Sequence, residues 1–387
     1  MTDGQPYDAI VVGGGVVGAS LAHHLMLRGL RRVLVCEQGR FPGAGATSRS
    51  GGLLRQHHTT HADTRLAVQG LRAYQDWAER VGGDCGYRRT GFAMVVAESY
   101  ADSLAKNTAA VQEAGGRAYL TEADELAAEY PGLRLDRPVA VSFEPDGGYA
   151  DPAAAASDLL ASARRRGAVL AEGVRVTSVT VSGDRVTGVT GNLGAFSAPL
   201  VLLAGGAWSR EPAATAGVDL PVEPRRIGIA RGRTGEPGHA LPVCIDDTLG
   251  TYFRPEADGG LWFGVPADPA VPLDGWPTPL TGAEVDAARR NLAPRVPALT
   301  GALIDGSRSG LDGYTPDRRP LIGPVGPEGL YACTGFSGGG FKTAPAVGEL
   351  VAAEVTGGAP EELLAPYRPG RFGAGTPAGS DFPYGHM

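Results

Sequence analysis

A glycine-rich turn near the start of the chain constrains the fold more than any other segment. Residues 7–12 (YDAIVV) predict a buried strand, the next six residues read GGGVVG, and an alanine- and leucine-rich stretch then predicts a helix. Gly13, Gly15 and Gly18 have the G-x-G-x-x-G spacing. The first glycine permits the tight turn, the second lets the backbone approach a pyrophosphate, and the third lets the helix pack closely on the sheet.

An acidic residue completes this pattern. A second strand-like run, VLVCE, ends at Glu37, about twenty residues after Gly18. Glu37 can accept hydrogen bonds from ribose hydroxyls, and its charge would repel a 2′-phosphate. The N-terminus of the intervening helix offers unpaired N–H groups and a positive dipole end to phosphates. The ordered strand, turn, helix, strand and acid therefore predict a dinucleotide site rather than a purely structural turn.

Length and composition limit the class of protein. A chain of 387 residues predicts two domains, and a net charge of −7 argues against nucleic acid as the main partner. The four cysteines show no close pairing, which suits a reducing compartment and indicates neither a disulfide framework nor a metal site. The polar start leads directly into the first strand, and no apolar run is long enough to span a bilayer. We therefore expect a cytoplasmic protein without a signal peptide.

The order of the predicted elements indicates a discontinuous nucleotide domain. The glycine turn occurs once, and further strand and helix patterns of the same domain return late in the chain, ending in a strand, a glycine loop and a helix. Stretches of short alternating strands and charged helices lie between them. The predicted nucleotide domain comprises residues 1–89, 145–219 and 305–365, the inserted domain comprises 90–144 and 220–304, and 366–387 is a Gly/Pro-rich tail without regular structure.

Five ordered motifs together resemble a known family. They are the N-terminal fingerprint and the segments GATSRSGGLLRQHH, VLLAGGAWS, TPDRRPLIGP and GFSGGGFK. In this order they resemble the D-amino-acid oxidase superfamily of flavoenzymes, in particular its sarcosine oxidase and glycine oxidase branch. The resemblance spans nearly the whole chain apart from the tail. It implies FAD rather than NAD, an α/β fold with a Rossmann-like FAD domain, and an inserted mixed α+β substrate domain built on an antiparallel sheet.

The resemblance also implies a set of cofactor-binding residues. The fingerprint glycines would hold the pyrophosphate, the acid would hold the ribose, and the glycine loop before the last helix would cap the flavin. The implied residues are Gly13, Gly15, Val17, Gly18, Glu37, Gln38, Arg40, Thr47, Ser48, Val174, Ala204, Gly205, Trp208, Gly338, Gly339, Gly340, Phe341 and Lys342. The alternative for the GFSGGGFK loop is a surface turn, but glycine clusters that open a helix are good anion sites.

The resemblance places substrate-binding side chains in the same segments. Lys342 would stabilise the anionic reduced flavin and help to bind a substrate carboxylate, and Arg55 would bind the same carboxylate. A salt bridge between the domains is an equally weighted alternative for Arg55. Tyr252 would line the substrate pocket. Three histidines follow Arg55 and are either acid–base residues or structural: His57, His58 and His61.

The chain departs from the family pattern at three positions. Gly310 stands where some relatives carry a cysteine that bonds to the flavin, so the resemblance implies non-covalent FAD. Trp262 stands where sarcosine oxidases carry a lysine that activates oxygen, although a core aromatic is the commoner role of such a residue. Asp312 replaces an arginine that clamps a carboxylate in glycine oxidases, and it would attract an ammonium or hydroxyl group. A solvent-facing turn aspartate is the alternative there.

The predicted reaction is hydride removal by FAD from the carbon next to the nitrogen of an amine or amino acid larger than glycine or sarcosine. The electron acceptor would be O2 or another oxidant. A 2-hydroxy-acid substrate is a close alternative, because the same scaffold serves both reactions. A natural-product tailoring enzyme that acts on a cyclic or carrier-bound amine, and a flavin subunit of a hetero-oligomeric dehydrogenase, are further alternatives. The sequence leaves the oligomeric state open.

Overall fold

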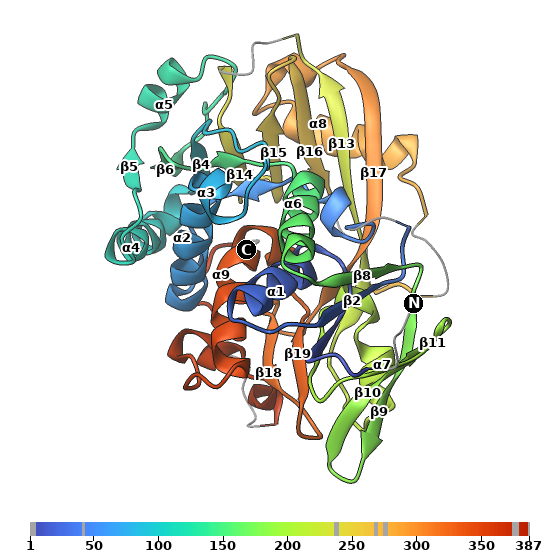
Figure 1. Ribbon diagram of the computed structural model, residues 1–387. Helices are drawn as coiled ribbons and strands as arrows, with labels where there is room; N and C mark the ends of the chain where they lie inside the picture. The colour runs from blue at the N-terminus through green and yellow to red at the C-terminus, as the bar shows by residue number, and fades with distance from the viewer. Residues whose placement is uncertain are drawn as a thin grey trace.

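The computed structural model describes residues 5–40, 43–235, 240–266, 270–273, 278–373 and 379–385. Two large sheets dominate these residues, one in the lower and one in the upper half of Figure 1. The arrangement confirms the predicted α/β class with a Rossmann-like part and a second, mixed part. Among the described helices, none combines the length and the apolar character that crossing a bilayer requires.

The described residues of the Rossmann-like part form a six-stranded sheet in the order β18-β19-β12-β1-β2-β8. All neighbouring strands are parallel except β18, which runs antiparallel to β19. The carboxyl end of β1 leads into the glycine turn and then into α1. The strands are β1 (Ala9–Val12), β2 (Val33–Glu37), β8 (Val169–Glu172), β12 (Val201–Leu203), β18 (Leu321–Pro324) and β19 (Leu330–Thr334).

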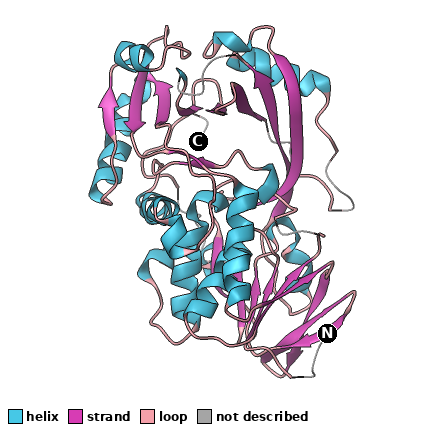
Figure 2. Cartoon of the chain, turned by 45° about the horizontal axis from the view of Figure 1, so that its top comes forward, coloured by secondary structure: helices cyan, strands magenta, loops and turns pink. Residues whose placement is uncertain are grey.

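This sheet is covered on both faces, which explains why its central strands are apolar throughout. Val11 and Val35 pack against helices on one face, whereas Ile10 and Leu34 pack against a smaller sheet on the other. Figure 2 shows the helices gathered beside the sheet. They are α1 (Val16–Leu27), α2 (His61–Gln75), α3 (Trp77–Arg80), α6 (Pro152–Arg165) and α9 (Gly340–Val355), and the small sheet contains β9 (Val176–Ser182), β10 (Arg185–Gly191) and β11 (Gly194–Ser197), with α7 (Arg210–Ala214) beside it.

The second part is an eight-stranded sheet in the order β17-β13-β16-β15-β14-β4-β6-β5. Its pairs are antiparallel except for β14 and β4, which run parallel. Its strands are β4 (Phe92–Ala97), β5 (Tyr119–Thr121), β6 (Val139–Glu144), β13 (Glu223–Arg233), β14 (Val243–Asp246), β15 (Thr251–Pro255), β16 (Gly260–Val265) and β17 (Leu303–Tyr314), and its helices are α4 (Ala101–Glu113), α5 (Ala123–Glu129) and α8 (Gly282–Leu292). A short ribbon of β3 (Leu53–Leu54) and β7 (Gly148–Tyr149) lies on the connections between the two parts.

One predicted domain boundary and the predicted lack of structure in the tail differ from the structure. The predicted division between residues 304 and 305 falls inside β17, which pairs along its whole length with β13 of the eight-stranded sheet. The predicted tail has more structure than its composition indicates, because residues 362–367 and 369–372 form short 3-10 turns. Tyr367 anchors the first turn, since it is fully buried and its hydroxyl donates a 2.7 Å hydrogen bond to Asp63 Oδ1.

Candidate active site

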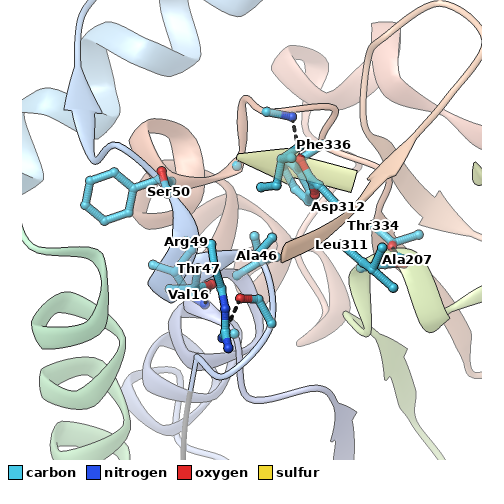
Figure 3. A pocket seen from close by; sticks show the side chains of 18 of the residues that line it. Val16, Ala46, Thr47, Arg49, Ser50, Ala207, Leu311, Asp312, Thr334 and Phe336 are labelled. Atoms are coloured by element: carbon cyan, nitrogen blue, oxygen red, sulfur yellow. Dashed lines mark hydrogen bonds between the residues drawn. The ribbon is translucent and has the colours of Figure 1, made fainter. Parts of the chain in front are cut away.

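A cavity of about 420 Å³ lies where the two large parts meet, and it extends from the glycine turn after β1 to the start of α9. Its wall combines residues from the turn at Gly13, from the segment around Thr47, from the eight-stranded sheet at Tyr252, and from the start of α9. Figure 3 shows Val16, Ala46, Thr47 and Arg49 on one side of this space and Leu311, Asp312 and Phe336 on another. The glycine turn near the start of the chain and the beginning of α9, more than three hundred residues later, therefore line the same cavity.

The fingerprint glycines are required by the backbone around them. Gly13 has φ of +108°, and a Cβ atom there would lie 2.5 Å from Ala204 O. A Cβ atom on Gly18 would lie 1.9 Å from Gly13 O, so Gly18 permits the close approach of α1 to the turn. Gly15 lines the cavity as the N-cap of α1 and has no side chain, Thr47 Oγ1 accepts a 3.1 Å hydrogen bond from Val16 N, and the first turn of α1 contains no acidic residue. This end of the cavity therefore presents a helix N-terminus that suits an anion.

Glu37, which the sequence predicts as a ribose-binding acid, lies beside this turn. It is 7 % exposed and lines the cavity. Its Oε2 accepts a 2.7 Å hydrogen bond from Gly14 N, and its Oε1 accepts a 2.6 Å bond from Gly39 N. Burial raises the pKa of the Glu37 carboxyl, while these two N–H donors oppose the rise. The carboxylate is thus held against the turn by backbone donors.

A second helix N-terminus faces the same cavity. The helix α9 begins at Gly340 after the N-cap Gly339, without a capping side chain or an acidic residue in its first turn. Asp312 fixes the preceding loop, because its Oδ2 accepts a 2.8 Å hydrogen bond from Gly338 N and its Oδ1 accepts a 2.9 Å bond from Gly313 N. Burial raises the pKa of Asp312. Asp312 therefore lines the cavity instead of facing solvent.

Two buried cations line the cavity near this loop. Arg55 is 8 % exposed, and its Nε and Nη1 atoms have no hydrogen-bond partner among the described residues. Lys342 is 6 % exposed, and its Nζ donates a long 3.4 Å hydrogen bond to Gly338 O. Burial lowers the pKa of Arg55 to about 10, and burial together with the charge of Arg55 lowers the pKa of Lys342 to about 7. Such a pair suits a carboxylate, which supplies the missing acceptors and charge.

Tyr252 forms part of the cavity wall, next to the segment that precedes Arg55. Its ring packs against two glycines, since Cβ atoms on Gly51 and Gly264 would lie 3.0 Å and 2.5 Å from ring atoms of Tyr252. Burial raises the pKa of Tyr252, so its hydroxyl stays protonated at neutral pH. Because these two positions are glycines, there is space for the Tyr252 ring and its hydroxyl at the cavity wall.

Most of the residues predicted from sequence share this cavity. Those that line it are Gly13, Gly15, Val17, Glu37, Gln38, Thr47, Arg55, Val174, Ala204, Gly205, Trp208, Tyr252, Asp312, Gly338, Gly340, Phe341 and Lys342. Four predicted cofactor residues lie outside the lining. Gly18 acts through packing, Arg40 is exposed, Ser48 accepts a hydrogen bond from Arg49 Nη1, and Gly339 caps α9.

The structure corrects the predicted position of Trp262. This side chain is 6 % exposed but does not line the cavity. The Arg308 guanidinium lies 4.8 Å from the centre of its ring, in the arrangement of a cation–π contact. Arg254, which faces the same side of the sheet two residues after Tyr252, stacks instead on Tyr149 at 4.4 Å. Trp262 thus belongs to the packing of the sheet beside the site, which is its commoner alternative role.

The histidines after Arg55 favour the structural interpretation, since none of the three lines the cavity. His57 Nε2 lies 2.8 Å from the Tyr384 hydroxyl, and burial lowers the pKa of His57 to about 3. Burial also lowers the pKa of His58 well below its usual value. His61 forms a partly exposed ion pair with Asp381 at 3.1 Å.

Sequence reasoning missed several lining residues. Arg49 follows Thr47 and Ser48 in a segment singled out from the sequence, and its stem lies against Gly310, where an added Cβ atom would be 3.1 Å from Arg49 Cβ. The adjacency to Thr47 is the signal that could have identified it. The other missed lining residues include Arg175, Ile245, Tyr314, Thr334 and Phe336. Phe336 lies within the GFSGGGFK motif and Arg175 directly follows Val174, so proximity to predicted residues could have identified both.

Comparisons with known proteins agree with this geometry. The model of the family described as "FAD dependent oxidoreductase", DAO, matches residues 8–354. The chain is 30 % identical over 363 residues to a 4-methylaminobutanoate oxidase (formaldehyde-forming) of Paenarthrobacter nicotinovorans, covering 91 % of this chain and 44 % of that protein. It is 26 % identical to human mitochondrial dimethylglycine dehydrogenase, covering 95 % and 45 % respectively. The chain therefore spans less than half the length of these two curated relatives.

Solved structures show the same fold over nearly the whole chain. The L-proline dehydrogenase from P. horikoshii superposes with a TM-score of 0.86 at 28 % identity, covering 96 % of this chain and 99 % of that one. The glycine oxidase from Geobacillus kaustophilus superposes with a TM-score of 0.83 at 26 % identity, covering 95 % and 99 %.

Proposed function

The chain belongs to the DAO family of FAD-dependent oxidoreductases, and from this premise we propose that it oxidises an amine or amino acid at the carbon next to nitrogen. The product would be an imine. The observation that carries the proposal is the pair of buried cations, Arg55 and Lys342, in a cavity that also contains the carboxylate of Asp312. In a substrate that carries both a carboxylate and an amine, the carboxylate would pair with the two cations and the amine would pair with Asp312.

The residues present fit FAD. The N-termini of α1 and α9 face one cavity, neither first turn carries an acidic residue, and Gly13 and Gly15 line the cavity without side chains of their own. We propose that these glycines hold the pyrophosphate, that Glu37 holds the ribose, and that the loop before α9 lies along the flavin. When bound, FAD supplies the acceptor for the hydride.

We propose that FAD binds without a covalent bond, which the thiols around the cavity support. Gly310 offers no attachment atom, and Arg49 covers it. Cys36 and Cys333 line the cavity, but burial raises the pKa of Cys36 to about 12 and raises the pKa of Cys333 as well. Both thiols therefore stay protonated at neutral pH and are poor nucleophiles.

The roles of the substrate-facing side chains follow from their charges. Arg55 and Lys342 would bind the carboxylate and fix the orientation of the substrate. Asp312 would accept a hydrogen bond from the amine or from another polar group of a substrate larger than glycine or sarcosine, through lone pairs that its two backbone donors leave open. Tyr252 would close the pocket with its ring.

A 2-hydroxy acid is the second candidate, because its carboxylate would fit the same two cations. The carboxylate of Asp312 in the cavity wall favours a substrate that brings a positive or donating group. The names of the relatives point the same way, since they act on methylaminobutanoate, dimethylglycine and proline.

The first experiment is an absorption spectrum of the purified protein, followed by acid precipitation. A yellow protein that releases free FAD is expected. A colourless protein, or one that binds a nicotinamide instead, would contradict the proposal. Flavin that stays with the precipitate would contradict non-covalent binding.

The second experiment compares substrates without oxygen. Proline, N-methylated amino acids and 4-methylaminobutanoate form the amine panel, and lactate and related 2-hydroxy acids form the control panel. Bleaching of the flavin by the amine panel alone supports the proposal, whereas bleaching by the hydroxy acids alone supports the second candidate. Turnover by this chain without added proteins would exclude the alternative of a dependent flavin subunit. An Asp312→Arg variant with unchanged activity and substrate preference would remove the proposed role of Asp312.

A further inference from the structure

The described end of the chain, residues 379–385, packs against both parts of the protein, and we call it the tail segment. On the FAD-domain side, Asp381 N donates a 2.8 Å hydrogen bond to Thr59 O, and Asp381 Oδ2 accepts a 2.9 Å bond from His61 N. On the other side, Asn107 Nδ2 in α4 donates a 2.9 Å hydrogen bond to Phe382 O. The tail segment thus connects the loop after Arg55 with the helix that covers the second sheet.

Tyr384 is the buried anchor of the tail segment. Its side chain is 6 % exposed and joins a small core with Phe92, Met94 and Val243 of the eight-stranded sheet. Its ring lies nearly parallel to that of His57, with 5.8 Å between the ring centres. The same Phe92 ring lies 6.0 Å from the Arg55 guanidinium carbon. Tyr384 therefore completes a core that directly supports the wall of the active site.

The hydroxyl of Tyr384 links two polar groups. Asn107 Nδ2 donates a 2.7 Å hydrogen bond to this hydroxyl, and the hydroxyl lies 2.8 Å from His57 Nε2. After accepting from the amide nitrogen, the hydroxyl keeps its proton and a second lone pair, so it pairs with either tautomer of a neutral imidazole. Burial lowers the pKa of His57 to about 3, which agrees with a neutral ring.

The backbone after Arg55 is held from a second side as well. The carboxylate of Glu144 accepts a 2.7 Å hydrogen bond from Gln56 N and a 2.6 Å bond from His57 N. Arg55 immediately precedes these two residues and makes no hydrogen bond through Nε or Nη1 within the described chain. The guanidinium itself lies over the Phe92 ring and is attracted by the charges of Glu144 and Asp63. The backbone that Glu144 and Tyr384 hold therefore sets the direction of Arg55 together with these charges.

We propose that Tyr384 is a positioning residue for substrate binding: it fixes the His57 loop, and through it directs Arg55 toward the carboxylate of the substrate. This inference rests on the proposed function only in taking a carboxylate as the ligand of Arg55. The tail segment would thereby influence how tightly the active site binds a carboxylate. Loss of the Tyr384 hydroxyl leaves His57 Nε2 without its hydrogen-bond partner and loosens the loop while the aromatic core remains.

The test uses the FAD-loaded protein, with Tyr384→Phe as the main variant. Acetate is the probe, and its dissociation constant is measured by titration calorimetry. The expected result is about three- to tenfold weaker acetate binding, since one buried hydrogen bond is lost. Tyr119→Phe is the matched control, because Tyr119 is 45 % exposed and lies on β5, at the edge of the second sheet. A chain that ends after residue 378 is the second variant and should bind acetate still more weakly.

A kinetic comparison separates positioning from general destabilisation. In Tyr384→Phe, KM should rise for an N-methylated amino acid, with kcat largely kept, and should not rise for the matched amine that lacks the carboxylate. Unchanged acetate affinity in both variants, or an equal rise of KM for both amines, would overturn the inference. If no amine reduces the flavin but acetate binding still weakens in Tyr384→Phe, the proposed reaction fails and the positioning role stands.

Discussion

Arg55 and Lys342 come from opposite ends of the sequence, line one cavity, and are coupled by their charges. Burial is the main reason that the pKa of Lys342 falls to about 7, and the positive charge of Arg55 contributes to the same fall. The charges of Asp63 and Asp312 oppose this fall without cancelling it. The site is therefore electropositive yet able to lose a proton near neutral pH, which makes anion binding sensitive to pH.

The first prediction concerns acetate binding between about pH 6 and about pH 9, a range in which acetate stays ionised. Below pH 7 Lys342 is charged in the free protein, so affinity is highest there. Above pH 7 binding must take up a proton, and affinity should fall by up to about tenfold per pH unit. Calorimetric titration across this range measures the effect. The Lys342→Met variant should bind more weakly with a flattened profile, and a flat profile in the unchanged protein would contradict the prediction.

The second prediction concerns the coupling itself. Replacing Arg55 by Met removes a nearby positive charge, so the pKa of Lys342 should rise and the inflection of acetate binding should move to higher pH. Affinity at low pH should also fall at least about tenfold, because hydrogen bonds to a charged group are lost. Arg55→Lys is the control, since it keeps the charge and should leave the inflection closer to its original position. An inflection that stays in place in Arg55→Met would show that the two cations do not interact.

The elements that the sequence predicted well are those whose constraints are local. The turn at Gly13 needs a positive φ and space beside Ala204, and only glycine meets both conditions. The loop around Gly338 shares the first condition, since its φ is +84°, but an added Cβ atom there would make only an ordinary contact of 3.8 Å with the Tyr314 hydroxyl. Such backbone requirements are visible in a single sequence, so both ends of the cofactor cavity were predictable.

The features that escaped prediction depend on contacts between distant segments. The family resemblance set Trp262 at the place of an oxygen-activating lysine, with a core aromatic as the alternative, and its contact with Arg308 on another strand favours the alternative. The tail was expected to lack structure because of its Gly and Pro content, yet Tyr384 is buried between His57 and Asn107. Composition describes local preference, and a few tertiary hydrogen bonds outweigh it here.

The third prediction concerns Glu37. Replacing Glu37 by Ala leaves the buried N–H groups of Gly14 and Gly39 without acceptors, at a cost of about 1–3 kcal/mol for an unsatisfied group. FAD retention and the midpoint of thermal unfolding should both fall. Glu172→Ala is the matched control, because Glu172 is exposed on the neighbouring strand directly opposite Glu37. Equal FAD retention in the two variants would argue against a role of Glu37 in the cofactor site.

The fourth prediction separates backbone strain from steric conflict at the fingerprint. In Gly13→Ala the new Cβ atom would lie 2.5 Å from Ala204 O, and φ is +108°, so the turn must move. In Gly29→Ala φ is +96°, but no atom lies within 4 Å of the added Cβ. The second variant should therefore lose only about 1 kcal/mol of stability and keep its FAD. The first should lose the cofactor as well, because the conflict displaces the turn that faces the pyrophosphate. Flavin absorbance per protein after gel filtration distinguishes the two, and equal flavin content would show that the approach of Ala204 does not shape the site.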